Sequence, residues 1–123
     1  MIEGVVNAAR EAVVTLLLQD SAGREREVDA VIDTGFNRYL TLPSTLVTEL
    51  DASFLGVTRV VLANGSEETL DMHGVTVLWD GQQREVDALV ADTTPLVGMS
   101  LLDGYSLYVE VRSGGRVVIE AAG

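Results

Sequence analysis

The chain has 123 residues, of which 47% are apolar, and it carries a net charge of −11. This length and composition suit one globular domain with a hydrophobic core, so we expect residues 1–123 to form a single domain. The acidic charge argues against nucleic acid and anionic membrane surfaces as partners, because phosphate groups are bound by basic faces.

The residue types present exclude several kinds of site. There is no cysteine and His73 is the only histidine, so no disulfide, thiolate metal site or multi-histidine metal site can form. We expect no metal and no cofactor. The start of the chain lacks the basic and long apolar segments of a signal peptide, and no apolar run is long enough to span a membrane. A cytoplasmic protein is the default expectation.

The first third of the chain reads as strands and turns. Residues 3–12 are compatible with a helix, a strand or an arm. The apolar residues 13–18 predict a strand, residues 20–23 a turn, and the alternation over residues 27–32 a second, half-buried strand. The two strands are expected to form a hairpin.

A short strand and a short helix are predicted next. Residues 39–42 are apolar enough for a strand. Pro43 suits the first turn of a helix, and Leu46 and Leu50 lie four positions apart on one helical face. We therefore expect a short helix over residues 44–50.

Two hairpins are predicted in the middle of the chain. Residues 58–63 and 67–79 are expected to be strands joined at Asn64-Gly65, a pair that favours a type I′ turn with positive φ at both positions. Gly74 is expected to mark a bulge or bend. Asp80-Gly81 predicts a second hairpin turn.

The remaining elements are short. Strands are predicted over residues 85–91, 105–111 and 116–120, and one or two helical turns over residues 99–103, ended by Gly104. The total is about eight strands and two short helices, which predicts an all-β domain, either a closed barrel or a sandwich.

Asp33-Thr34-Gly35 follows residues 28–32, which are apolar except for Asp29, and is the most informative motif. A carboxylate near a core must be paired, hydrogen-bonded or protonated. An Asx-type turn at a strand end is the plain structural interpretation. The functional interpretation is one half of a carboxylate pair that shares a proton and hydrolyses peptide bonds.

Only one copy of this tripeptide is present. Asp92-Thr93-Thr94 and Asp20-Ser21-Ala22 are the nearest alternatives, and both lack the glycine. If the chain is an enzyme of this kind, the second Asp33 must come from a second chain, which a two-fold symmetric homodimer would supply.

Four features in order resemble the retropepsin-like aspartic peptidases, in their small single-domain form found in retroviruses and bacteria. They are Val31–Gly35 as the catalytic loop, Ala63–Ser66 as the tip of a flap, the hairpin at Asp80-Gly81, and Leu96-Val97-Gly98 with the helix after it. The similarity runs over roughly residues 13–118. It implies a closed β-barrel or sandwich with one or two short helices.

The resemblance also implies roles for individual residues. Asp33 would be catalytic, Thr34 would hydrogen-bond across the dimer, and Gly35 would present its backbone carbonyl to substrate. Asn64 and Gly65 would lie at the flap tip, over a peptide or protein substrate.

Three more positions belong to the implied substrate-binding set, with some departures from the family. Phe36 stands where Ala or Ser is common, so its ring should reshape a pocket. Asn37 stands where an acid is common and Met99 where Arg is common, so the ion pair between them is absent. Gly98 belongs to the apolar-apolar-Gly motif that passes beside the catalytic loop.

Three other side chains are given plain structural interpretations. Trp79 is expected in the core or an interface, and His73 on the surface or in a partly buried strand. Arg38 is expected to be a solvated charge, although pairing with an acid or facing substrate stays open.

The leading hypothesis is a homodimeric aspartic endopeptidase that uses a water activated by two Asp33 carboxylates. The alternative is a catalytically weak or inactive dimerisation or peptide-binding module with the same fold. A β domain of a larger assembly, without peptidase ancestry, is a third hypothesis.

Overall fold

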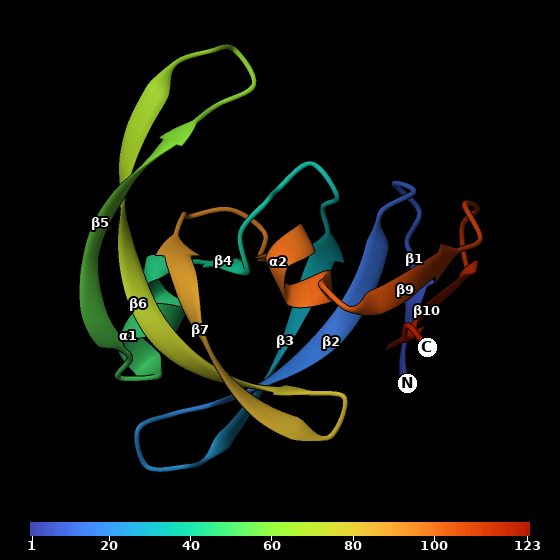
Figure 1. Ribbon diagram of the computed structural model, residues 1–123, viewed down its shortest axis with the longest axis horizontal. Coiled ribbons are helices and arrows are strands. Elements are labelled where there is room, and N and C mark those ends of the chain that lie inside the picture. The colour runs from blue at the N-terminus through green and yellow to red at the C-terminus, as the bar shows by residue number, and fades with distance from the viewer.

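The computed structural model describes residues 1–123 and contains ten strands and two short helices (Figure 1). In chain order they are β1 (Ile2–Val6), β2 (Ala12–Gln19), β3 (Glu25–Ile32), β4 (Leu40–Leu42), α1 (Ser44–Glu49), β5 (Ser53–Val61), β6 (Glu67–Trp79), β7 (Gln82–Val90), β8 (Leu96–Val97), α2 (Met99–Leu102), β9 (Tyr105–Val109) and β10 (Arg116–Ala121). Neither helix has the length and apolar character that a bilayer crossing would need.

All ten strands belong to one sheet, in the order β5-β6-β7-β4-β8-β3-β2-β1-β10-β9. β2 pairs with β6 as well, with Leu17 opposite Leu78, and this pairing closes β6, β7, β4, β8, β3 and β2 into a ring. Closure removes free edges from that part of the sheet. The expected all-β fold with two short helices is therefore confirmed, and it is a closed barrel.

The core fills this ring because alternate residues of each strand point inward. The inward side chains of β2 and β6 are Val14, Leu16, Leu18, Val75, Val77 and Trp79, all at most 4% exposed. The ring of Trp79 meets that of Tyr105 edge to face, with centroids 5.8 Å apart. The expectation that Trp79 lies in the core is confirmed.

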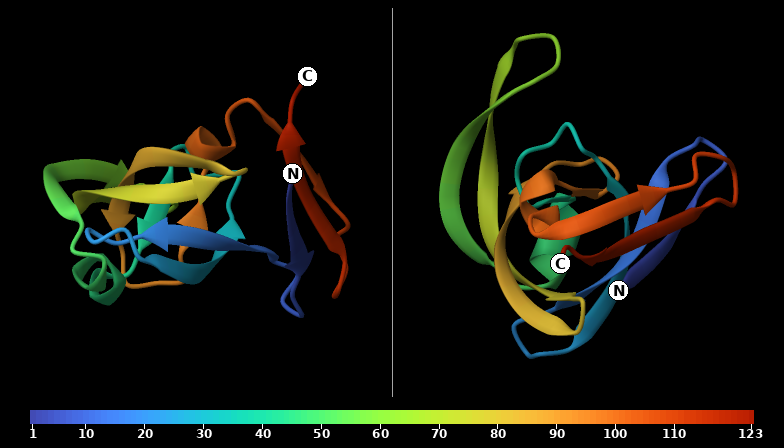
Figure 2. Two further views of the ribbon diagram at one scale, coloured as in Figure 1. Left: turned by 90° about the horizontal axis from the view of Figure 1, so that it is seen from below. Right: turned by 45° about the vertical axis from the view of Figure 1, so that its right-hand side comes forward.

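Two parts of the sheet extend beyond the ring. The β5–β6 hairpin, named the flap below, arches away from the barrel (Figure 1). On the other side, β1, β10 and β9 form a separate layer near both termini (Figure 2). Of the three conformations left open for residues 3–12, the strand is correct for residues 3–6, because β1 pairs with both β10 and β2.

The turn at the flap tip differs from the expected type I′ turn. Gly65 has a φ of 82°, but Asn64 does not have a positive φ. Leu62 N donates to Ser66 O at 2.8 Å and Gly65 N donates to Leu62 O at 2.9 Å, so residues 63–65 form a three-residue loop. The second hairpin does have positive φ at both turn positions, 52° at Asp80 and 81° at Gly81.

The bulge expected at Gly74 lies on the opposite strand. β6 pairs with β7 without a register shift from Met72 to Trp79. β5 instead carries one extra residue, Leu55, before Gly56, whose φ of 127° favours glycine. The side chain of Leu55 lies over Gly74, 3.5 Å from where a Cβ would stand.

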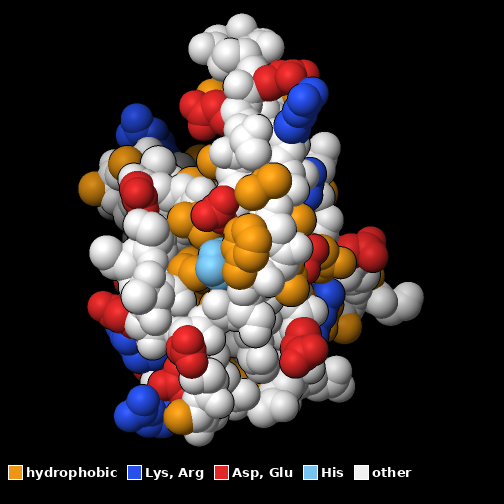
Figure 3. Space-filling model, turned by 90° about the vertical axis from the view of Figure 1, so that its left-hand side faces the viewer, with side chains coloured by type: hydrophobic (Ala, Val, Ile, Leu, Met, Phe, Trp, Pro, Cys, Tyr) orange, Lys and Arg blue, Asp and Glu red, His pale blue; other side chains and the backbone are white.

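His73 lies on the outer face at the base of the flap. Its Nδ1 is 3.0 Å from Ala52 O, and its ring meets that of Phe54 edge to face at 5.5 Å. Figure 3 shows the histidine among apolar side chains on this face. The expected partly buried strand position is confirmed.

Helix α1 begins at Ser44, and the preceding Pro43 provides no side-chain cap. Asp92, in the loop between β7 and β8, supplies one. Its Oδ1 accepts hydrogen bonds from Ser44 N and Ser44 Oγ, both at 2.8 Å. These bonds, above all the one from the backbone N–H, hold the pKa of the Asp92 carboxyl below its usual range.

The cap makes stability depend on pH in a defined direction. Because the folded pKa is lowered, the stabilisation is present above the unfolded pKa of about 3.9 and is lost as pH falls through the folded value. We expect Asp92→Asn to lower the urea midpoint near neutral pH, with the difference from wild type closing in acid.

Asp71→Asn is the matched control, since Asp71 is exposed and makes no side-chain hydrogen bond in the structure. It removes the same charge from an acidic protein without removing a hydrogen bond to the start of α1. A wild-type advantage over Asp92→Asn that is the same at acid and neutral pH would contradict the capping role.

Candidate active site

Asp33 lies where β3 ends, at the start of the loop that leads to β4. Its backbone N–H donates to Val97 O at 2.9 Å, and its Oδ1 accepts from Gly35 N at 2.9 Å. Phe36 N donates to Asp33 O at 3.1 Å, which closes the turn. The carboxylate is partly buried, and one of its oxygens is left without a hydrogen bond in the chain. The Asx turn is therefore present, and it fixes the carboxylate.

Strand β8 supports the Asp33 loop, because it pairs with the strands on both sides of that loop. This two-residue strand is parallel to β3 and antiparallel to β4, so it lies between them. Gly98 follows at once and is buried against the loop. A Cβ on Gly98 would lie 2.0 Å from Arg38 O and 2.6 Å from Phe36 Cδ2, so only glycine fits.

The start of α2 holds the loop through further hydrogen bonds. Met99 N donates to Phe36 O at 2.7 Å and Ser100 N to Arg38 O at 3.2 Å. Ser100 Oγ donates to Asn37 O at 2.6 Å. The expectation that the apolar-apolar-Gly motif passes beside the Asp33 loop is confirmed by these contacts.

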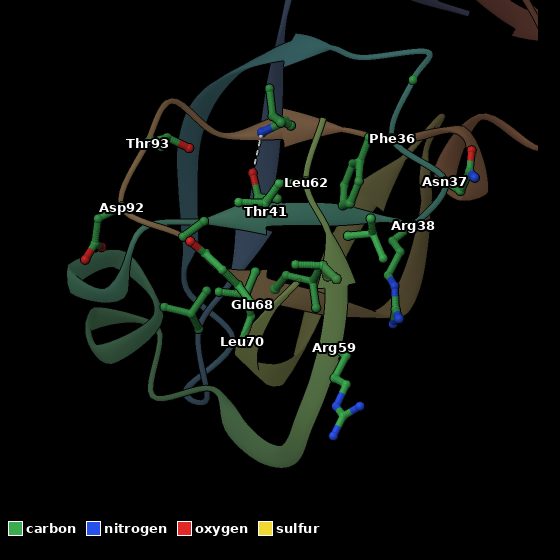
Figure 4. Close-up of a pocket in the computed structure, with 17 residues that line it drawn as sticks. Phe36, Asn37, Arg38, Thr41, Arg59, Leu62, Glu68, Leu70, Asp92 and Thr93 are labelled. Atoms are coloured by element: carbon green, nitrogen blue, oxygen red, sulfur yellow. Dashed lines mark hydrogen bonds between the residues drawn. The ribbon is translucent and has the colours of Figure 1, made fainter. Parts of the chain in front are cut away.

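A cavity of about 800 Å³ lies between this loop, the inner face of the flap and the segment after β7 (Figure 4). Its lining is formed by Gly35, Phe36, Asn37, Arg38, Thr41, Arg59, Val60, Val61, Leu62, Glu68, Leu70, Leu89, Val90, Ala91, Asp92, Thr93 and Leu96. Thr41, on its floor, also braces the site, because its Oγ1 accepts a hydrogen bond from Leu96 N at 3.0 Å.

The structure brings together only some of the candidate site residues. Gly35, Phe36 and Asn37 line the cavity, whereas Asp33 and Thr34 lie beside it in the same loop. Asn64 and Gly65 are exposed at the flap tip, away from the lining. Gly98 is buried beneath the loop, where its position is explained by packing.

Sequence reasoning missed the flap and barrel residues of the cavity. From the first side of the flap the lining is a run of four consecutive residues, 59–62, at the end of β5 and just after it, so alternation gives no signal there. The alternation of Glu68 and Leu70 on β6 is the signal that could have found the inner face of that strand. No cluster of three or more His, Asp or Glu side chains is placed to hold a metal ion.

Arg38 is not the solvated charge that the sequence suggested. It is partly buried and lines the cavity. Its Nη2 donates to Thr58 Oγ1 at 3.0 Å, and its Nη1 lies 4.0 Å from Met72 Sδ. The side chain therefore links the Asp33 loop to both strands of the flap.

The packing at Gly98 is directly testable. We expect Gly98→Ala to lower the free energy of unfolding by about 1–3 kcal/mol or more, because a Cβ there overlaps backbone atoms of the loop. Urea unfolding measures this. Gly74→Ala is the control, since its Cβ would meet only ordinary contacts with Leu55. A Gly98→Ala protein as stable as the Gly74→Ala control would contradict the close packing at Gly98.

No family model matches the sequence, and no curated protein is significantly similar to it. Solved structures do match. They include EIAV protease complexed with the inhibitor HBY-793, with 19% identity, a TM-score of 0.62, and coverage of 78% of this chain and 88% of that one. A retropepsin-like aspartic protease from Rickettsia conorii has 14% identity, a TM-score of 0.60, and coverage of 99% of this chain and 91% of its own.

The Simian Foamy Virus (mac) protease matches with 17% identity and a TM-score of 0.50, over 72% of this chain and 90% of that one. At these identities the likeness concerns the fold, and it agrees with the resemblance noted in the motifs. The chain has the fold of the retropepsin-like aspartic proteases.

Proposed function

We propose that this protein is an aspartic endopeptidase that acts as a homodimer, with Asp33 of each chain forming the catalytic pair. The observation that carries the proposal is a partly buried carboxylate in a loop fixed by β8 and Gly98, beside a cavity under a hairpin flap. The solved proteins that share the fold are named as proteases.

The need for a dimer follows from the chemistry. Peptide hydrolysis by carboxylates uses two of them sharing a proton, and the only side-chain hydrogen bond of Asp33 within the chain comes from Gly35 N. The sequence contains a single Asp-Thr-Gly. A two-fold axis beside the loop would bring a second, identical carboxylate to the first.

The proposed reaction then needs no other group. The ionised carboxylate takes a proton from a water, whose oxygen bonds to the carbonyl carbon of the scissile peptide. The protonated carboxyl donates to the carbonyl oxygen. When the C–N bond breaks, the first carboxyl gives the leaving amine the proton that it took from water, and the second carboxylate takes a proton back from a hydroxyl of the tetrahedral intermediate. The peptide is thereby divided into an acid and an amine, and the pair again holds one proton. The pair titrates as a unit, so neither role belongs permanently to one chain.

The other candidate residues have proposed roles that suit their positions. Thr34 is exposed, and its hydroxyl has no hydrogen bond within the chain, which leaves it available to the partner's loop. Gly35 lines the cavity and would present its carbonyl to substrate. Asn64 and Gly65 would cover substrate from the flap tip, where Asn64 Oδ1 already accepts bonds from Ser66 N and Oγ.

One observation favours the alternative of a peptide-binding module with little catalysis. The ring of Phe36 lines the cavity three residues after Asp33, where it takes space from a bound peptide. A transition-state-like inhibitor separates the two functions, because it should bind tightly only where two Asp33 carboxylates are assembled.

We expect Asp33→Asn to reduce peptide cleavage by about 100- to 10,000-fold or more, since an amide can neither take the proton from water nor share it. The assay uses a mixed peptide library at mildly acidic to neutral pH. Asp71→Asn is the control for loss of one exposed carboxylate. Cleavage that survives Asp33→Asn unchanged would overturn the proposed function.

A further inference from the structure

Arg38 projects from a fixed point of the backbone. Its carbonyl accepts a hydrogen bond from Ser100 N at 3.2 Å and packs against Gly98. Arg38 stands three residues after Gly35 and lines the part of the cavity next to the catalytic loop. It also lines a smaller hollow with Asp87, but no ion pair joins the two side chains. Figure 4 shows it beside Phe36, on the wall formed by that loop.

The guanidinium of Arg38 has unused bonding capacity. A guanidinium carries five N–H donors in a planar fork. The contacts of Arg38 are one hydroxyl, Thr58 Oγ1, and one weak sulfur acceptor, Met72 Sδ. Five of the eight arginines have a carboxylate within 4.0 Å, and Arg38 is one of the three that have none. A partly buried cation without an anion is costly, so an incoming carboxylate would be favoured.

The other charged groups of the cavity do not take this place. The Asp92 carboxylate is bonded to Ser44. Arg59 lines the cavity at its open side, because its side chain is 79% exposed, and it lies 3.8 Å from Glu67. Glu68 pairs with Val60 and lies four residues from Met72 along β6. This spacing places Glu68 about 14 Å from Met72, in the direction of the flap tip.

We propose that Arg38 makes this cavity selective for a substrate side chain that bears a carboxylate, Asp or Glu. The inference rests on the proposed function, in that a peptide occupies the cavity. The carboxylate would accept two parallel hydrogen bonds from the guanidinium, the geometry for which arginine is suited. Phe36 and Leu89, which also line the cavity, provide apolar walls for the aliphatic stem of such a side chain.

The net charge of −11 does not cancel this selectivity. At an ionic strength of about 0.15 M the Debye length is about 8 Å, so distant exposed acids are screened while a contact inside the cavity is not. The acidic surface slows the approach of an acidic peptide, and the guanidinium stabilises it once it is bound.

Arg38 also links the Asp33 loop to the flap. Weaker binding after its removal could therefore come from a lost preference for acidic side chains or from a loosened flap. A purely supporting role predicts that a change at Arg38 weakens every peptide equally. A selective role predicts that the ratio between peptides changes, and that Arg38→Glu reverses the preference toward Lys.

The experiment measures binding to the Asp33→Asn protein, so that it does not depend on cleavage. The probes are fluorescent peptides of one apolar sequence in which a single Glu, Gln or Lys is moved along the chain, at about 0.15 M salt. At the position that occupies the cavity, we expect Glu to bind about tenfold or more tightly than Gln, as charge-assisted hydrogen bonds do.

The variants then test the assignment. Arg38→Gln should bring the Glu-to-Gln ratio to about one, and Arg38→Glu should favour the Lys peptide. Arg112→Gln makes the same change of charge on the turn before β10 and should leave the ratio as it was. If the protein with Arg38 intact binds the Glu and Gln peptides equally at every peptide position, the inference is overturned. A preference for Glu that remains in Arg38→Gln would overturn it as well.

The outcomes separate this inference from the proposed function. Asp33-dependent cleavage without a Glu preference retains the peptidase and removes the role of Arg38. A Glu preference without cleavage by the wild-type protein retains the carboxylate-selective cavity and removes the peptidase. If no peptide binds at any concentration tested, the cavity is not a peptide site and the inference is overturned.

Discussion

The close contact of Gly98 with the backbone of the Asp33 loop is the constraint on which the site depends. Strand β8 lies between β3 and β4, and Gly98 brings the chain so near to Phe36 and Arg38 that no side chain fits between them. The first amides of α2 then bond to the same loop. These contacts hold the backbone of the loop, and the bond from Gly35 N holds the Asp33 carboxylate, before any substrate arrives.

The barrel and the flap serve the site in different ways. Pairing of β2 with β6 closes the ring and gives the flap a fixed base, while the outer part of β5 and β6 is free to arch over the cavity. Arg38 joins the two, because it starts in the fixed loop and ends at Thr58 and Met72 on the flap strands. A peptide bound beside Arg38 would therefore contact both the rigid and the projecting parts of the fold.

Local patterns predicted the parts of this structure that depend on nearby residues. The alternation in β2 and β3, the helix after Pro43 and the stop at Gly104 are of this kind. The passage of Leu96-Val97-Gly98 beside the Asp33 loop was predicted from the family resemblance and not from a period, because the two residues of β8 are too few to show one. The contacts of Arg38 were not predictable, because it meets strands twenty and more residues away. Asn64-Gly65 correctly predicted the hairpin but not its turn type. The register of the two strands leaves three residues in the loop, and one dipeptide does not determine that register. The site was predictable as far as the Asp33 loop and the Gly98 motif beside it, and the flap residues and Arg38 that complete the cavity were not.

The central claim is that two chains assemble one site from two copies of Asp33. A crystal structure of the unmodified protein tests this most directly, because it gives the distance between the two Asp33 carboxylates. We expect a two-fold symmetric dimer in which the nearest carboxylate oxygens are about 3 Å apart, so that the pair shares one proton. Chains that associate through another face, or remain monomeric with each Asp33 carboxylate open to solvent, would contradict it.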